Sequence, residues 1–185
     1  MPRWPPGLSN EPRIAAARCS GMIETETGDT AGVIAPPPLI ALGVVVLGVA
    51  LDWLLPAYVL AVLLSLGERI AIAVILIAAG GALGLAAVWQ FRAAHTHVEP
   101  WKPSSALVSS GIFRWLRNPM YVGLGLLAAG IGIALASDWT LVMLMPGALL
   151  IHFGVVKREE RYLEAKFGDA YRRYKDAVPR YGVRV

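Results

Sequence analysis

Residues 70–91 form a continuous run without a charged side chain. A bilayer is crossed by about 20 apolar residues in a helix, so this run is long enough to span. Because backbone polar groups must be paired inside lipid, the run has to be helical. The mean hydropathy of +0.57 and the 56% share of hydrophobic residues exceed those of an ordinary soluble domain. The sequence therefore predicts an all-α integral membrane protein.

A second apolar region, residues 36–66, contains one charged residue, Asp52. The stretch around Asp52 and Pro56 is typical of a break between two helices. The second of these helices, residues 54–66, is shorter than a normal span. We expect it to be tilted, re-entrant or packed inside the bundle.

Two more apolar regions, residues 120–137 and 139–156, are separated by Asp138 and predict a tight helical hairpin. Gly80 and Gly84 form a small-xxx-small pair that permits close helix packing. Residues 36–156 are thus predicted to form a bundle of four or five membrane helices.

Basic residues are concentrated in two segments that the hairpin places on one side of the membrane. They are Arg92, Lys102, Arg114 and Arg117 in the first segment, and Lys157, Arg158, Arg161, Lys166, Arg172, Arg173, Lys175, Arg180 and Arg184 in the second. The positive-inside rule assigns this side to the cytoplasm. The same asymmetry explains the net charge of +4, so we expect a lipid bilayer as partner and no nucleic acid.

The first 35 residues are polar, rich in proline and glycine, and lack a signal-peptide pattern, so we predict a disordered extension. The side of the membrane on which this extension lies depends on whether residues 54–66 cross the bilayer. The single cysteine, Cys19, excludes an internal disulfide framework. The oligomeric state stays open.

Residues 157–185 are polar and predict a cytoplasmic amphipathic helix with a tail. Leu163, Phe167, Tyr171 and Tyr174 recur at helical spacing and form one apolar stripe, and Pro179 ends the helix. We expect this helix to lie on the membrane surface or over the mouth of the bundle, where it would form a site with residues 92–121.

Arg117 and Asn118 precede Pro119, which suits the first turn of a helix. Free amides at such an end attract an anion, and the guanidinium of Arg117 matches a carboxylate or phosphate. The alternative, that Arg114 and Arg117 only anchor the helix at lipid headgroups, stays open.

Glu159 and Glu160 follow the last apolar region and could bind a cationic ligand, or could pair with neighbouring basic residues on a solvated helix. His152 interrupts that apolar region and is a functional candidate, with a helix–helix hydrogen bond as its rival. His95 and His97 have no accompanying cluster of carboxylates or cysteines, so no metal site is expected.

Three motifs follow one another in the second half of the chain. They are Ala106-Leu107-Val108-Ser109-Ser110-Gly111-Ile112-Phe113-x-Trp115-x-Arg117-Asn118-Pro119-Met120-Tyr121-Val122-Gly123, then Glu159-Glu160, then Phe167-Gly168-x-x-Tyr171-x-x-Tyr174-x-x-x-Val178-Pro179. In order and spacing this region resembles the isoprenylcysteine carboxyl methyltransferase and phospholipid methyltransferase superfamily of integral membrane enzymes. The resemblance covers roughly residues 92–180.

The resemblance implies methyl transfer from S-adenosylmethionine, bound at the cytoplasmic ends of the last two membrane helices, to a lipophilic or small-molecule acceptor. The cofactor contacts that it implies are Ser105, Ala106, Leu107, Val108, Phe113, Asn118, Pro119, Met120, Tyr121 and Glu159. The catalytic candidates are His152, Arg117 and Glu160, of which His152 or Glu160 would serve if a base is needed.

Two positions depart from the family pattern. Asn118 stands where eukaryotic members usually have histidine, and Val155 stands where they have an arginine for the prenylcysteine carboxylate. Lys157 or Arg158 could replace that arginine only if the helix were rotated, so prenylcysteine is not the expected acceptor. The alternatives are a membrane reductase of the sterol reductase type that uses NADPH, and a non-catalytic membrane bundle.

Overall fold

The computed structural model describes residues 30–97, 99, 102 and 104–182, so most of the extension predicted for residues 1–35 lies outside the described residues. Throughout the described part the regular structure is helical, and the all-α prediction is confirmed. The elements are α1 (Pro37–Leu54), α2 (Val59–Leu63), α3 (Leu66–Ala93), the 3₁₀ helix η1 (Gly111–Arg114), α4 (Pro119–Ala134), α5 (Asp138–Ile151), the π-helix η2 (His152–Val156), α6 (Lys157–Phe167) and α7 (Asp169–Ala177).

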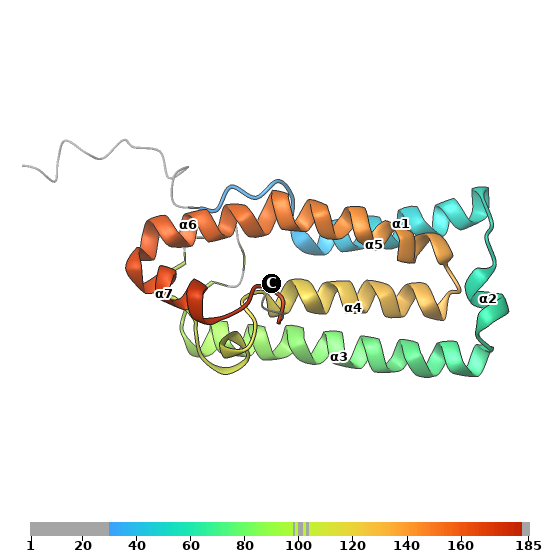
Figure 1. Cartoon of the computed structure of the whole chain (residues 1–185), viewed down its shortest axis with the longest axis horizontal. Coiled ribbons are helices and arrows are strands. Elements are labelled where there is room, and N and C mark those ends of the chain that lie inside the picture. Colours follow the sequence, from blue (N-terminus) through green and yellow to red (C-terminus); the bar gives the residue numbers. More distant parts are fainter. Residues whose placement is uncertain (1–29, 98, 100–101, 103, 183–185) are drawn as a thin grey trace, which may run out of the picture.

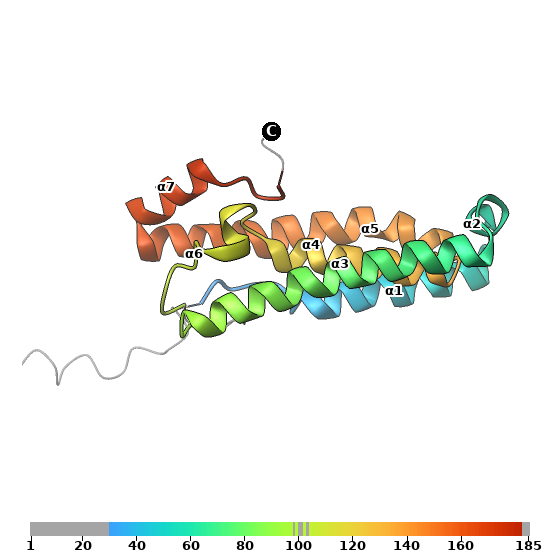
Figure 2. The same cartoon turned by 90° about the horizontal axis from the view of Figure 1, so that it is seen from below.

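The long helices lie side by side in an elongated bundle (Figures 1 and 2). By length and composition, Pro37–Leu54, Leu66–Ala93 and the continuous helix Asp138–Phe167 could each cross a membrane. α4 is apolar but has 16 residues, just below the usual minimum of about 17 for a span. The predicted count of four or five membrane helices therefore stays a prediction.

The segment between α1 and α3 does not cross the bundle. Its helix, α2, has five residues, none of them buried, and lies at the end of the bundle opposite α6 and α7 (Figure 1). Five residues advance a helix by only about 7.5 Å. The expectation of a tilted, re-entrant or inwardly packed helix over residues 54–66 is wrong. Because α2 does not cross, α1 begins at the end of the bundle that carries α6 and α7.

α3 and α4 approach each other through glycines. A Cβ atom added to Gly80 would lie 2.6 Å from the carbonyl oxygen of Gly123, and one added to Gly123 would lie 2.7 Å from that of Gly80. The two backbones are therefore in direct contact, as small residues allow in membrane helices. The packing role predicted for the pair Gly80 and Gly84 is confirmed at Gly80, whereas a Cβ atom added to Gly84 would lie in open space.

The predicted hairpin of α4 and α5 is confirmed, with its turn at residues 135–137. The hydroxyl of Ser137 accepts a hydrogen bond from the amide of Thr140 and so caps the start of α5. The carboxylate of Asp52 in α1 accepts hydrogen bonds from the Ser137 hydroxyl and the Trp139 amide. This contact ties α1 to the turn.

The polar C-terminal region forms two helices where the sequence predicted one. α6 continues α5 through η2, and the chain then breaks at Gly168, which has a φ of +53°. Such a φ favours glycine because a Cβ atom would be strained there. α7 turns back toward the bundle (Figure 2) and buries Tyr171.

Candidate functional site

The site begins at the π-helical turn η2, which joins α5 to α6. A π turn holds an extra residue, so it shifts the faces on which all later side chains lie. Val155 and Val156 are fully buried, and Gly154 leaves room for the side chain of Ile34. The amide of Ile34 donates to the carbonyl of Gly154 over 3.3 Å, which holds the segment before α1 against this turn. Beyond the turn, Glu159 and Glu160 of α6 make contacts with other parts of the chain.

Glu159 faces α4. Its carboxylate accepts a hydrogen bond of 2.6 Å from the phenol of Tyr121. Tyr121 lies in the first turn of α4, which starts at Pro119 as its missing N–H allows. A carboxylate and a phenol from two different helices are thus joined at the same end of the bundle.

Glu160 is buried, and its carboxylate binds two arginines. It accepts 2.8 Å hydrogen bonds from Nη1 of Arg117 and Nε of Arg180, and one of 2.6 Å from Nη2 of Arg180. The Glu160 carboxylate raises the pKa of the Arg180 guanidinium above its usual value. Both carboxylate oxygens of Glu160 are thus held by guanidinium groups. The alternative of a solvated glutamate pair is wrong for Glu160.

The same contacts fix the C-terminal strap, by which we mean residues 178–181. The amide of Arg117 donates to the carbonyl of Pro179 over 3.0 Å, and the side-chain amide of Asn118 donates to the carbonyl of Arg180 over 3.3 Å. Val178 is buried. The strap therefore lies over the start of α4 and brings Tyr181 next to η2.

A cavity with aromatic walls lies among the end of α3, the segment before α4, α6 and α7. We call it the aromatic cavity; it is lined by Ala31, Phe91, His97, Glu99, Ser104, Ala106, Leu107, Val108, Phe113, Arg117, Glu159, Tyr162, Leu163, Tyr171 and Tyr174. Its volume is about 100 Å³. Phe91 and Phe113 meet edge to face with ring centroids 5.2 Å apart.

Tyrosines hold the walls of the aromatic cavity together. The Tyr174 phenol donates to the carbonyl of Phe113 over 2.8 Å, and the amide of Ser104 donates to the Tyr162 phenol over 3.1 Å. Burial raises the pKa of Tyr171 to about 12 and raises the pKa of Tyr174 as well. Both phenols therefore stay protonated at physiological pH, and that of Tyr174 acts as a hydrogen-bond donor.

Arg117 has an unsatisfied donor at this cavity. Its side chain is 10% exposed, and its Nε is buried without a hydrogen-bond partner in the described part of the chain. Buried donors are usually paired, because an unpaired one loses its hydration without compensation. The free Nε is therefore an observation that points to a ligand with an acceptor group.

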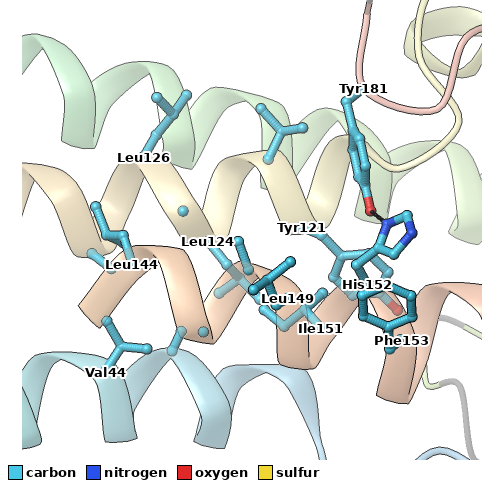
Figure 3. A pocket seen from close by; sticks show the side chains of 16 residues that line it. Val44, Tyr121, Leu124, Leu126, Leu144, Leu149, Ile151, His152, Phe153 and Tyr181 are labelled. Carbon is cyan, nitrogen blue, oxygen red and sulfur yellow. Dashed lines mark hydrogen bonds between the residues drawn. The ribbon is translucent and has the colours of Figure 1, made fainter. Parts of the chain in front are cut away.

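A second cavity, the apolar groove, lies between α1, α4 and α5 and has a volume of about 610 Å³ (Figure 3). Aliphatic side chains such as Val44, Leu126 and Leu144 form most of its lining. Its polar side chains are Tyr121, His152 and Tyr181. Nδ1 of His152 is 2.9 Å from the Tyr181 phenol, and the two rings stand at one end of the groove. Tyr121 lines this groove and bonds to Glu159 of the aromatic cavity, so this pair lies between the two spaces.

Half of the predicted cofactor residues line the aromatic cavity: Ala106, Leu107, Val108, Phe113 and Glu159. Ser105 lies beside it, with its hydroxyl donating to the carbonyl of His95.

The other predicted residues belong to the start of α4 and do not line this cavity. Asn118 holds the strap, Pro119 is buried, and Met120 packs against the cluster of Ala87, Val108 and Phe113. Tyr121 lines the apolar groove. Their roles as cofactor contacts stay predictions.

Of the catalytic candidates, Arg117 and Glu160 pair with each other, and His152 lies at the end of the apolar groove. The sequence reasoning did not single out Phe91, Tyr162, Tyr181 or Arg180. Tyr162 could have been found as a lining residue by extending the aromatic stripe of the C-terminal region one turn toward the N-terminus. Nothing in the sequence pairs Arg180 with Glu160.

Comparison with known proteins gives two matches. The sequence profile described as phospholipid methyltransferase matches residues 68–170, which is more than half of the chain. An uncharacterized protein of Haemophilus influenzae is 58% identical over 33 residues, which are 18% of this chain and 52% of that protein. The chain thus spans about half the length of this curated relative. No solved structure matches the chain.

Proposed function

Since the chain belongs to the phospholipid methyltransferase family, we propose that it transfers the methyl group of S-adenosylmethionine to a lipophilic acceptor that enters from the bilayer. One observation carries this proposal: a polar, aromatic cavity and an apolar groove share the wall formed by Tyr121 and Glu159. S-adenosylmethionine supplies a methyl group that its sulfonium charge makes electrophilic. The protein has to align donor and acceptor and to exclude water.

The side chains of the aromatic cavity match the polar groups of this cofactor. The free Nε of Arg117 suits a carboxylate. Glu159 suits an ammonium group or ribose hydroxyls, and the rings of Phe91 and Phe113 suit adenine or a sulfonium cation. The donor set therefore fits the cofactor that the family implies.

The volume of the aromatic cavity sets a condition on binding. At about 100 Å³ it is smaller than the roughly 300–1,000 Å³ of most ligand pockets. Residues 104–108 form an irregular wall without helix or strand, so this wall is the part that can move outward at least cost. We expect binding to enlarge the cavity by displacing these residues.

The proposed site lies at the end of the bundle that carries α6 and α7 (Figure 1). Most basic residues of the described part belong to these two helices and to the segments next to them. By the positive-inside rule this end faces the cytoplasm, where S-adenosylmethionine is made available. The proposed acceptor path runs from the bilayer along the apolar groove to Tyr121.

Isothermal titration of the purified protein with S-adenosylmethionine tests the cofactor. The variant Glu159→Gln replaces the carboxyl group of a proposed contact by an amide, and we expect it to weaken binding by roughly 10- to 100-fold, as loss of a charge-assisted hydrogen bond to the ligand does. The control Glu164→Gln lies on the same helix but pairs with the exposed Arg172 and Lys175, and should bind like the wild type. Binding of NADPH in place of S-adenosylmethionine would contradict the proposal.

Transfer is tested separately, with the methyl group of S-adenosylmethionine labelled. Protein in lipid nanodiscs is incubated with a membrane lipid extract, quinols, phenols, thiols and prenylcysteine. A labelled organic-soluble product supports the proposal and identifies the acceptor class. Tight cofactor binding without transfer to any of these acceptors would favour a non-catalytic bundle.

A further inference from the structure

The apolar groove restricts the head group of any molecule that occupies it. Its lining is almost entirely aliphatic and aromatic, and no carboxylate or guanidinium lines it in the part of the chain that the structure describes. Moving a charged head group into such surroundings costs several kcal/mol unless an opposite charge pairs with it. The groove therefore suits a long apolar chain with a small, neutral polar head.

The position of that head follows from the polar residues of the groove. The phenol of Tyr121 is committed to Glu159. His152 and Tyr181 remain, and they form a hydrogen-bonded pair at the end of the groove near η2 (Figure 3). When Nδ1 of His152 donates to the Tyr181 oxygen, the lone pair of Nε2 is available. Nε2 has no partner among the described residues.

A neutral hydroxyl or thiol must lose its proton when it is methylated. Three nearby groups could accept this proton, and the structure separates them. Glu160 is held by two arginines, and Glu159 lines the aromatic cavity and is bonded to Tyr121. His152 alone of the three lines the apolar groove and has a free ring nitrogen.

From this geometry we propose that His152 is the general base for methylation of an apolar alcohol, phenol or thiol, and that Tyr181 positions its imidazole ring. This proposal rests on the methyltransferase function proposed above. The acceptor oxygen or sulfur bonds to the methyl carbon while the carbon–sulfur bond of the sulfonium breaks. The electron pair of that bond stays on the cofactor sulfur, which becomes a neutral thioether, and the acceptor proton passes to Nε2 of His152.

Acceptors with the same chain and different heads test the proposal. Protein in nanodiscs with labelled S-adenosylmethionine receives dodecanol, para-dodecylphenol, dodecanethiol, dodecylamine or dodecanoate. We expect labelled product from the first three compounds. Lys157 lies 4.6 Å from the ring of Phe153 and could instead attract a carboxylate, so dodecanoate is the competing acceptor. Transfer to dodecanoate or dodecylamine alone would overturn the proposal and leave the methyltransferase function standing.

The variant His152→Gln isolates the role of the base. General bases contribute roughly 100- to 10,000-fold, so we expect transfer to dodecanol and para-dodecylphenol to fall at least about 100-fold, with partial rescue by added imidazole. Tyr181→Phe should lower methyl transfer to the same two acceptors several-fold, and added imidazole should not restore it. The controls His95→Gln and Tyr58→Phe change an exposed histidine and an exposed tyrosine outside the groove. Equal activity of His152→Gln and His95→Gln would overturn the proposal.

Two readouts do not depend on turnover. A dodecanol that carries a diazirine should, on photolysis without cofactor, label peptides of α4 and η2, with dodecanol competing for the labelling. Titration calorimetry should show that His152→Gln binds S-adenosylmethionine like the wild type. Photolabelling elsewhere on the chain would overturn the assignment of the groove. Absence of cofactor binding by the wild type would overturn both proposals.

Discussion

Replacing Glu160 by glutamine should release the C-terminal strap from the start of α4. The substitution keeps the shape of the side chain and removes the charge that Arg117 and Arg180 share. The side chains of Glu160 and Arg117 are each 10% exposed, whereas that of Arg180 is 29% exposed. Breaking a fully buried ion pair from one side costs about 3–5 kcal/mol, because the remaining charge is left uncompensated.

The partial exposure of Arg180 places the expected cost at the lower end of this range, about 3 kcal/mol. Since 1.4 kcal/mol corresponds to a factor of ten, the opening equilibrium of the strap should rise about 100-fold. The amide of Arg117, which donates to the carbonyl of Pro179, reports this opening directly.

Hydrogen exchange of the Arg117 amide, followed by mass spectrometry of peptides that cover residues 115–118, measures the effect. Glu164→Gln is the matched control, since Glu164 also lies on α6 and also holds two cations, but these are Arg172 and Lys175 of α7 at the surface. Exchange should accelerate in Glu160→Gln and stay at the wild-type rate in Glu164→Gln. Equal exchange in the two variants would refute the argument that burial gives the cluster its strength.

Three further substitutions test other contacts, each by thermal unfolding in detergent. Gly123→Ala should destabilise by about 1–3 kcal/mol because its Cβ would meet the backbone of α3, whereas Gly125→Ala, with open space around it, should be neutral or slightly stabilising. Asp138→Ala should cost about 1 kcal/mol, since its carboxylate accepts the first two amides of α2, and unchanged stability would contradict that capping role. Tyr121→Phe removes the hydrogen bond to Glu159 and should also cost about 1 kcal/mol, while weakening S-adenosylmethionine binding less than Glu159→Gln does.

The sequence was sufficient for features that depend on local composition. An uninterrupted apolar run predicts α3, and the single charge at Asp138 predicts the turn between α4 and α5. Residues 54–66 have the same apolar composition, yet they lie at the end of the bundle. Their position depends on the carboxylate of Asp138, which is 79 residues from Val59. A local pattern contains no information about such a partner.

The candidate site also depends on partners that are distant in the sequence. Charge runs on helices are usually solvated, and the sequence around Glu160 gives no reason to expect burial. Its partners are 43 and 20 residues away, at Arg117 and Arg180. The π turn η2 is equally invisible, because the residues His152–Val156 would fit a regular α-helix. This turn shifts the helical faces that follow it. The directions in which the side chains of Glu159 and Glu160 point therefore cannot be predicted from periodicity alone.

Arg117 links the two halves of the proposed site. Its Nη1 holds Glu160 and thereby the strap, while its Nε is free and the residue lines the aromatic cavity. An acceptor group bound to Nε would fix the guanidinium plane and favour the docked strap. Linkage then requires reciprocity: the factor by which saturating S-adenosylmethionine slows exchange of the Arg117 amide equals the factor by which strap docking tightens cofactor binding. Glu160→Gln should accordingly weaken S-adenosylmethionine binding although Glu160 does not line the cavity, and an unchanged affinity together with an open strap would show that the two events are independent.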